Sequence, residues 1–186
     1  AAKDHARSIN QLGLLNLGAP GVLQNFDVAV KHIKKAANLG DAEAQFNYAS
    51  LLLEGKVVDM NPKQANDWLK KSAKQNYVPA QLRLAHNYHM GIGAKKNPDL
   101  AFYWYNRSAT QGNAFALYEV GARYQSGEGV TKDPIQAHKF LNLSLSKGYQ
   151  KAMPELQSLT ENLTRDQLKT AQNEAKSWKP EVSENN

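Results

Sequence analysis

The side chains of this chain that could carry out chemistry are few, and no local motif gathers them. His86 and His89 are three residues apart, so they would share one face of a helix and could bind a metal ion, with Glu119 as a third ligand. Nothing in the spacing brings Glu119 to the two histidines, and we predict no metal site. Serine and histidine residues occur, but no local motif combines a nucleophile, a base and an orienting group in the way that a catalytic pocket requires. We therefore expect no enzymatic activity and no cofactor.

Two pairs of glycines invite comparison with phosphate-binding loops. The pairs are Gly91-Ile92-Gly93 and Gly127-Glu128-Gly129. Neither follows a predicted strand, and neither precedes the Gly-Lys-Ser/Thr sequence or the spaced third glycine that cradles a phosphate. We interpret both as turns between helices. Cysteine is absent, which excludes disulfides, thiolate metal sites and cysteine nucleophiles.

Composition and charge indicate a folded chain without a membrane span. The 186 residues are 41% hydrophobic and 22% charged, and no run approaches the roughly 18 to 20 apolar residues that a spanning helix needs. The net charge of +6 raises the question of nucleic acid or anionic lipid. Lys34-Lys35, Lys70-Lys71 and Arg107 recur at matching places and could form a basic ridge. We favour a solvated face there and do not expect nucleic acid binding.

The elements that must position these residues come from an internal repeat. Four blocks of 36 residues align without insertion or deletion, and they are residues 6–41, 42–77, 78–113 and 114–149. Small and apolar residues recur in the first half of each block at spacings of three, four and seven, which is the apolar stripe of an amphipathic helix. The third place holds Ser8, Ala44, Ala80 and Ala116, and the seventh holds Leu12, Tyr48, Leu84 and Val120.

A turn and a second helix follow in each block. Gly55, Gly91 and Gly127 interrupt the first stripe, where a turn between antiparallel helices needs positive φ. The second helix is predicted to begin at an Asn or Asp cap followed by proline, in Asn61-Pro62, Asn97-Pro98 and Asp133-Pro134. It carries a repeated alanine and a bulky ring, and it ends at Gly40, Asn76, Gly112 and Gly148. Each block is therefore predicted to be one capped αα-hairpin.

A lone hairpin cannot bury its apolar faces, so neighbouring hairpins must stack. We predict an all-α fold, a right-handed superhelical solenoid of about four and a half 36-residue repeats in a single domain over residues 1–186. A partial repeat and a capping helix are expected over residues 150–178, because Thr164 and Gln167 form a capping box and a helix from Arg165 can run to Trp178 before Pro180. Residues 179–186 are predicted to be a frayed tail.

The hairpin resembles the Sel-one-like repeats (SLR family), relatives of the tetratricopeptide repeats, over residues 6–149 and partly over 150–178. The second helix of the third block and the turn of the fourth block carry the motifs, Ala101-Phe102-Tyr103-Trp104-Tyr105-Asn106-Arg107-Ser108-Ala109 and Gly127-Glu128-Gly129-Val130-Thr131-Lys132-Asp133-Pro134. The first block departs most, with Asn16 to Gly21 in the turn, Phe26 in place of the proline and His32 in place of the tryptophan. Ala1 to His5 correspond to the end of a preceding second helix, so the chain is a candidate fragment of a longer array.

The resemblance implies that the first helix of each hairpin lines a concave groove. Side chains of that helix outside the core places are then candidates for recognition, and we call these twelve residues the partner stripe. They are Phe46, Asn47, Ser50, Glu54, Arg83, His86, Asn87, Met90, Phe115, Glu119, Ala122 and Arg123. Their residue types vary among the blocks where the core places do not, and the middle of the array suits an acidic or polar peptide.

The function predicted from this arrangement is binding of a protein or peptide partner in the groove. The resemblance implies a bacterial scaffold or adaptor of the cell envelope. A dedicated inhibitor, such as an immunity protein that blocks a toxin, is the alternative, and glycan or peptidoglycan binding through Phe46, Phe115 and Tyr118 is a third. We expect a periplasmic or secreted location, with a cytoplasmic one left open because no signal peptide is visible and the start of the chain could be a processed end.

Overall fold

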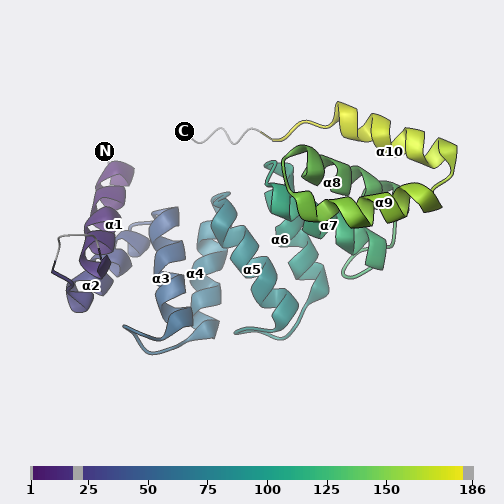
Figure 1. Ribbon diagram of the computed structural model, residues 1–186. Coiled ribbons are helices and arrows are strands. Elements are labelled where there is room, and N and C mark those ends of the chain that lie inside the picture. The colour runs from purple at the N-terminus through teal and green to yellow at the C-terminus, as the bar shows by residue number, and fades with distance from the viewer. Residues whose placement is uncertain (1, 19–22, 182–186) are drawn as a thin grey trace. The chain divides into compact units, whose positions relative to one another are not determined.

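The computed structural model describes residues 2–18 and 23–181, and over these residues the chain is α-helical without strands (Figure 1). This confirms the predicted all-α class. The helices are α1 (Ala2–Gly18), α2 (Phe26–Asn38), α3 (Ala42–Glu54), α4 (Pro62–Lys74), α5 (Val78–Met90), α6 (Pro98–Thr110), α7 (Ala114–Ser126), α8 (Pro134–Ser146), the short 3-10 helix η1 (Gln150–Ala152), α9 (Met153–Asn162) and α10 (Arg165–Ser177). Most of the predicted tail lies outside the described residues.

The helices form two compact units, residues 1–96 and 97–186. The single domain expected over residues 1–186 stays a prediction. In unit 1, α1 pairs with α2 and α3 with α4 as hairpins, while α3 also packs on α2 and α5 on α4 (Figure 1). Completely buried aliphatic side chains fill the space between these helices. They are Ala29, Ile33, Leu69, Ala73 and Leu84.

The helix boundaries follow from local capping. The Asn61 side chain accepts a hydrogen bond from the backbone N–H of Gln64, and Pro62 occupies the first turn of α4, where a missing N–H costs nothing. Asn97 and Asp133 cap α6 and α8 in the same way. The first helices of repeats two to four end at glycines with positive φ, as predicted. These are Gly55, Gly91 and Gly127, with φ of 67°, 79° and 82°.

The second glycine of the later turns is required by packing against the preceding repeat. A Cβ atom on Gly93 would lie 2.3 Å from the backbone oxygen of Pro62, the first residue of α4. A Cβ atom on Gly129 would lie 2.2 Å from the backbone oxygen of Pro98, the first residue of α6. In both places the backbone of a turn rests directly on the start of the preceding second helix, and no side chain fits between them.

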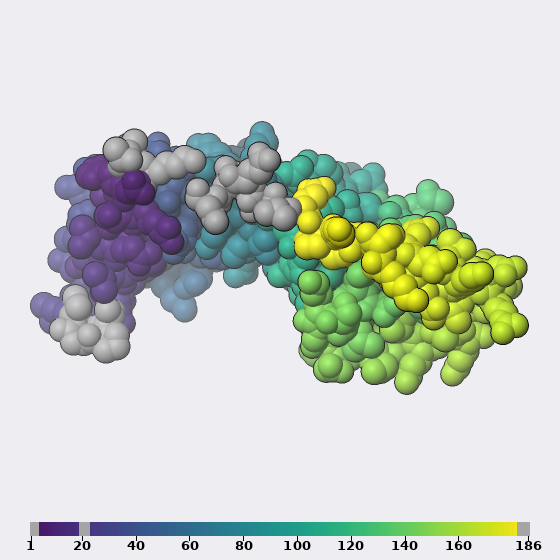
Figure 2. Space-filling model, turned by 90° about the horizontal axis from the view of Figure 1, so that it is seen from above, coloured from purple at the N-terminus to yellow at the C-terminus, as the bar shows by residue number. Residues whose placement is uncertain are grey.

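Unit 2 places α6 on α7, pairs α7 with α8, and continues through η1 and α9. Its core includes Ala137, Leu141, Ala152 and Leu159. The predicted last helix is found as α10, one residue shorter than expected, and Thr164 and Gln167 form the predicted capping box. Helix α10 returns to pack on α8 and forms the yellow ridge along unit 2 in Figure 2.

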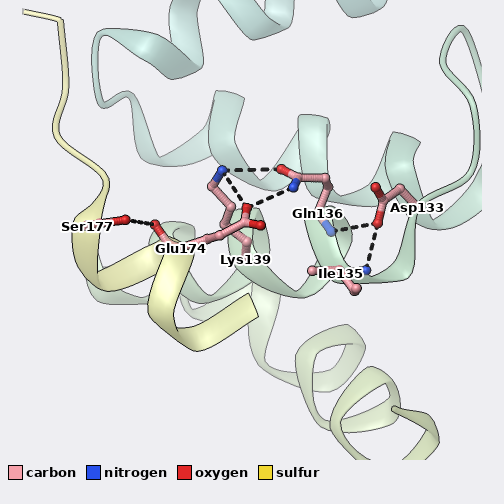
Figure 3. A network of polar contacts seen from close by, with 6 residues as sticks. All are labelled: Asp133, Ile135, Gln136, Lys139, Glu174 and Ser177. Atoms are coloured by element: carbon pink, nitrogen blue, oxygen red, sulfur yellow. Dashed lines mark hydrogen bonds and ion pairs between the residues drawn. The ribbon is translucent and has the colours of Figure 1, made fainter. Parts of the chain in front are cut away.

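Polar contacts hold α10 on α8. The Glu174 carboxylate accepts hydrogen bonds from Gln136 Nε2 at 2.8 Å and from Lys139 Nζ at 3.1 Å (Figure 3). Beyond the helix, the backbone N–H of Glu181 donates to the Thr110 oxygen at 2.7 Å. Ring atoms of Trp178 and Pro180 lie within 4 Å of the position that a Cβ on Gly112 would take. The segment from α10 to Glu181 therefore ties α8 to the turn after α6.

The first repeat differs from the prediction at its start. Residues 2–5 form the first turn of α1 and are not the end of a preceding second helix, so that expectation is wrong for these residues. The reason is local, because Asp4 stands where the other repeats have Gly or Asn and offers no left-handed stop. Ser8 Oγ donates to the Asp4 backbone oxygen at 2.9 Å within the continuous helix. At the other end α1 continues to Gly18, and residues 19–21 of the predicted turn lie outside the described residues.

Candidate partner-binding face

On α3 the core residues and the partner-stripe residues differ in burial. The core places Ala44, Tyr48, Ala49 and Leu52 are buried. Of the stripe, Phe46, Asn47 and Ser50 are half-buried and Glu54 is exposed. The helical period produces this division, because the two sets lie on different faces of one amphipathic helix. Four predicted residues therefore lie together along one side of α3.

Short contacts hold these side chains in place. Asn47 Nδ2 donates to Asn10 Oδ1 of α1 at 3.2 Å, and the Ser50 hydroxyl donates to the Phe46 backbone oxygen at 3.0 Å. The Phe46 ring meets the Tyr77 ring edge-on, with centroids 5.6 Å apart. Burial, together with the nearby carboxylate of Glu43, raises the pKa of Tyr77. The tyrosine hydroxyl is therefore neutral at physiological pH.

A pocket opens beside this part of the stripe, with a volume of about 540 Å³. The side chains that line it come from α1, the start of α2, α3 and the following turn, and they are Leu14, Leu17, Phe26, Asn47, Ser50, Leu51, Glu54, Lys56 and Val57. Three of these nine residues belong to the predicted stripe. Volumes of about 300–1,000 Å³ are typical of sites that hold small ligands. We call it the first-junction pocket, because it lies where repeat one meets repeat two.

On α5 the stripe residues divide between surface and core. Arg83, His86 and Met90 are exposed. Asn87 is buried, and its Nδ2 donates to Asn66 Oδ1 of α4 at 2.7 Å. A side chain so enclosed supports the packing of α5 on α4 and offers no surface to a partner. Three of the four predicted residues of α5 are accessible.

Arg123 of α7 is also buried. Its guanidinium pairs with the Glu119 carboxylate one turn earlier and lies 4.4 Å from the centroid of the Tyr105 ring. Phe115, Glu119 and Ala122 are half-buried. Burial is the main reason that the pKa of Tyr105 is raised to about 12. The position of Arg123 in the interior indicates a supporting role for this side chain.

The aromatic residues considered for glycan binding pack on other rings. Phe115 and Tyr118 lie 5.8 Å and 5.2 Å from the ring of Tyr149, centroid to centroid. The Tyr118 hydroxyl donates to Glu155 Oε1 at 2.8 Å. Burial, followed by this hydrogen bond, raises the pKa of Tyr118 to about 12. These ring contacts hold α7, the end of the fourth repeat and α9 together.

The structure also bears on metal binding, on the predicted basic ridge and on membrane insertion. In the described part of the chain, no group of three or more His, Asp or Glu side chains is arranged to hold a metal ion. Lys71 Nζ lies 3.9 Å from the Trp68 ring centroid, and Lys34 Nζ lies 5.7 Å from that of Tyr48. Lysines of the predicted basic ridge thus cover aromatic rings of the hairpins. Among residues 2–18 and 23–181, no helix has the length and apolar content to cross a bilayer.

Sequence reasoning missed the apolar half of the pocket. Leu14, Leu17, Phe26, Leu51 and Val57 were not among the predicted site residues, yet they line it. The available signal was the departure of the first block from the repeat, in which Phe26 replaces the proline found at Pro62, Pro98 and Pro134. A departure from a repeat at a position that the fold otherwise restricts is a reason to look for a function there.

The repeat profile agrees with the sequence and the structure. A profile of the Sel1 repeat matches residues 6–41, 42–77, 78–113 and 114–149, so the chain belongs to the Sel1 repeat family. Sel1 repeats are non-catalytic protein-interaction scaffolds that stack as solenoids, which confirms the predicted fold class. No curated protein sequence is significantly similar to the chain.

Solved structures of bacterial repeat proteins share the fold. A protective antigen of uropathogenic Escherichia coli with an SLR fold is 26% identical, with a TM-score of 0.78 over 93% of this chain and 37% of the other. A Sel1 repeat protein from Oxalobacter formigenes is 33% identical, with a TM-score of 0.77 over 81% of this chain and 62% of the other. Cysteine-rich protein B of Helicobacter pylori is 18% identical, with a TM-score of 0.51 over 62% and 91%, and shows the fold alone. The chain thus spans less than two thirds of the first two proteins.

Proposed function

We propose that this chain is a non-catalytic binding module whose protein partner lies along the partner stripe of α3 and α5. One observation carries the proposal. The residues of α3 and α5 that face away from the core are accessible and differ in chemistry from repeat to repeat, while the buried places beside them keep small or apolar residues. The fold does not restrict the residue types on the accessible face. Evolution can therefore select residues there that bind a partner.

The proposed contact residues are the accessible members of the stripe. Arg83, His86 and Met90 on α5 offer a cationic group, an imidazole and an exposed thioether. This surface suits an acidic or polar partner face with an apolar contact beside it. Asn87 supports this face from the interior through its hydrogen bond to Asn66 of α4. The proposed setting is a bacterial cell envelope, which rests on the family resemblance.

The proposal is tested by affinity capture from a lysate of the source organism. The test variant combines Arg83→Ala, His86→Ala and Met90→Ala, and Glu119 is left intact because its carboxylate pairs with the buried Arg123. A control variant with Lys63→Ala and Lys74→Ala removes two exposed charges from α4. We expect the test variant to lose partners that both the control and the unchanged chain retain, with all three equally folded by circular dichroism.

The identity and affinity of the captured partners separate the two roles. One enzyme held at roughly nanomolar strength supports a dedicated inhibitor, whereas several envelope proteins at roughly micromolar strength support a scaffold. If the test variant keeps every partner, the stripe is the wrong surface. Loss in the α4 control alone would move the contact to the exposed face of α4 that carries Lys63 and Lys74.

A further inference from the structure

The junction between repeats one and two differs from the later junctions at two coupled places. Phe26 stands at the first position of α2, where the next repeats have Pro62 and Pro98. Val57 stands in the turn after α3, where the next repeats have Gly93 and Gly129. At the later junctions these two places touch, because the glycine backbone rests on the proline oxygen with no room for a Cβ. At the first junction both places carry large side chains.

A pocket lies where the close contact is missing. Both Phe26 and Val57 line the first-junction pocket of about 540 Å³. The Phe26 side chain is 46% exposed although it is a large aromatic group. A proline and a glycine would bring the turn against the start of α2, as they do in the other repeats. The two departures therefore act together to hold the junction open.

The pocket has an apolar wall and a polar wall. Leu14, Leu17, Phe26, Leu51 and Val57 form the apolar wall, which favours a large apolar group over water. The polar wall consists mainly of Asn47 and Ser50 of α3.

Hydrogen bonds within the chain orient that polar wall. The Asn47 amide nitrogen donates to Asn10, and the Ser50 hydroxyl donates to the Phe46 oxygen. Asn47 Oδ1 and the lone pairs of Ser50 Oγ remain as acceptors, which match the N–H donors of a peptide backbone.

The two charges at the rim cancel. Lys56 Nζ lies 3.5 Å from Glu54 Oε2, and both side chains are well exposed to solvent. An exposed pair of this kind contributes little energy and leaves no net charge to select an ionic ligand. The chemistry of the pocket therefore favours a neutral occupant with an apolar body and N–H donors.

We propose that the first-junction pocket is an anchor site for one large apolar side chain of a polypeptide partner, such as leucine or phenylalanine. The backbone N–H groups that flank this side chain donate to Asn47 Oδ1 and Ser50 Oγ. The inference rests on the proposed binding function and names the residue class that it recognises. Phe26 and Val57 determine this specificity by keeping the junction open.

The probes for a direct test are N-acetyl-leucinamide and N-acetyl-phenylalaninamide, which carry one side chain with its two amide groups. Methyl resonances of Leu14, Leu17, Leu51 and Val57 are followed by NMR in the full chain. We expect saturable shifts with a Kd of roughly millimolar order, as for other ligands of about a dozen heavy atoms. N-acetyl-alaninamide is the matched control and should give no saturable shift. Raising the salt concentration should leave the affinity unchanged.

The closed variant combines Phe26→Pro with Val57→Gly and copies the later junctions. It should weaken probe binding by at least about tenfold. Val57→Lys is a second variant in the exposed turn, and it should weaken binding without depending on a repacked junction. The variant with Arg83→Ala, His86→Ala and Met90→Ala should bind the probes as tightly as the unchanged chain. Loss of the protein partner by this variant can therefore be distinguished from loss of probe binding at the first-junction pocket.

Three outcomes would overturn the inference. One is the absence of saturable shifts at the pocket methyl groups of the unchanged chain. Another is binding of simple 1-alkanols more tightly than the amides, because that ranking would identify a lipid-type pocket with no use for peptide N–H donors. Retention of probe binding by both Val57 variants would also assign the shifts to another surface.

Discussion

Helix α1 of unit 1 and helix α8 of unit 2 are covered to different extents. On α1 of unit 1, Leu12 and Leu15 are 50% and 45% exposed, whereas Leu84 and Asn87, at the equivalent places of α5, are 0% and 1% exposed. In unit 2, α10 covers α8, and the buried Ala171 of α10 lies in a helix that is otherwise mostly polar. Helix α1 therefore exposes residues at places that are buried in α5, whereas α8 is covered by α10.

The contrast shows that the repeat pattern and the burial of its residues are separate properties. Leu12 follows the same period as Leu84, yet Leu12 is half-exposed and Leu84 is completely buried. A stack of hairpins needs a polar surface where it stops, and α10 provides that surface for unit 2. Substitutions of the same kind on the two faces should therefore have unequal effects.

The largest effect is expected from Ala171→Asp, which places a charge in the contact between α10 and α8. An unpaired buried charge costs about 3–5 kcal/mol, and urea unfolding followed by tryptophan fluorescence measures the loss. Leu15→Asp introduces the same charge on the open face of α1 and should change stability by no more than about 0.5 kcal/mol. Equal losses for the two variants would contradict the contrast between the faces.

Leucine truncation tests the same contrast within equivalent places of the repeat. Leu84→Ala removes a completely buried side chain and should lower the free energy of unfolding by about 2–4 kcal/mol. Leu12→Ala removes a half-exposed side chain, and we expect a loss of about 1 kcal/mol or less. Chemical denaturation of both variants gives the comparison, and a larger loss at Leu12 would show that α1 is covered in solution.

The packing of α9 on α8 should respond to pH through His138 of α8. Its ring is buried, with Nε2 3.1 Å from Thr160 Oγ1, and burial lowers its pKa from the ordinary 6.5. The unfolded chain then binds a proton more readily, so stability is complete above pH 6.5 and is lost as the pH falls through the folded-state pKa. Unfolding of His138→Gln at a series of pH values should show a shallower decline than the unchanged chain.

The smallest effect is expected at the Glu174 network. Glu174→Gln should cost less than about 1 kcal/mol, because the carboxylate is partly exposed. The hydrogen bonds from Gln136 and then Lys139 lower the pKa of Glu174 from 4.5. Its contribution is therefore present above pH 4.5 and is lost as the pH falls through the lowered value. Thermal unfolding of the two chains should differ at neutral pH and converge in acid.

The fold could be predicted from the sequence because its signals are local and repeated. Asn61-Pro62 starts a helix and Gly55 ends one by backbone geometry that adjacent residues determine. The exposure of the partner-stripe residues was harder to predict, because Asn87 and Arg123 are polar residues at a place where the second block has Leu51. Their residue types indicate surface, and only contacts with α4 and α6 show that they are buried.

The first-junction pocket depends on two residues that are 31 places apart in the chain, Phe26 and Val57. No periodicity within a helix connects them. The sequence marks each as a departure from the repeat, but the distance between them follows from how α3 packs on α2. A comparison of the repeats at both places together, and not one at a time, would have pointed to this junction.

The cover on α8 also sets an order of events during synthesis. Unit 1 has all its helices once residue 96 has left the ribosome, and it can bury Leu69 and Leu84 while the rest of the chain is still being made. The face of α8 stays open until α10 and the segment up to Glu181 have emerged. For that interval Gln136 and Lys139 of α8 lack their partner Glu174, so the contact between α8 and α10 is among the last that unit 2 can form.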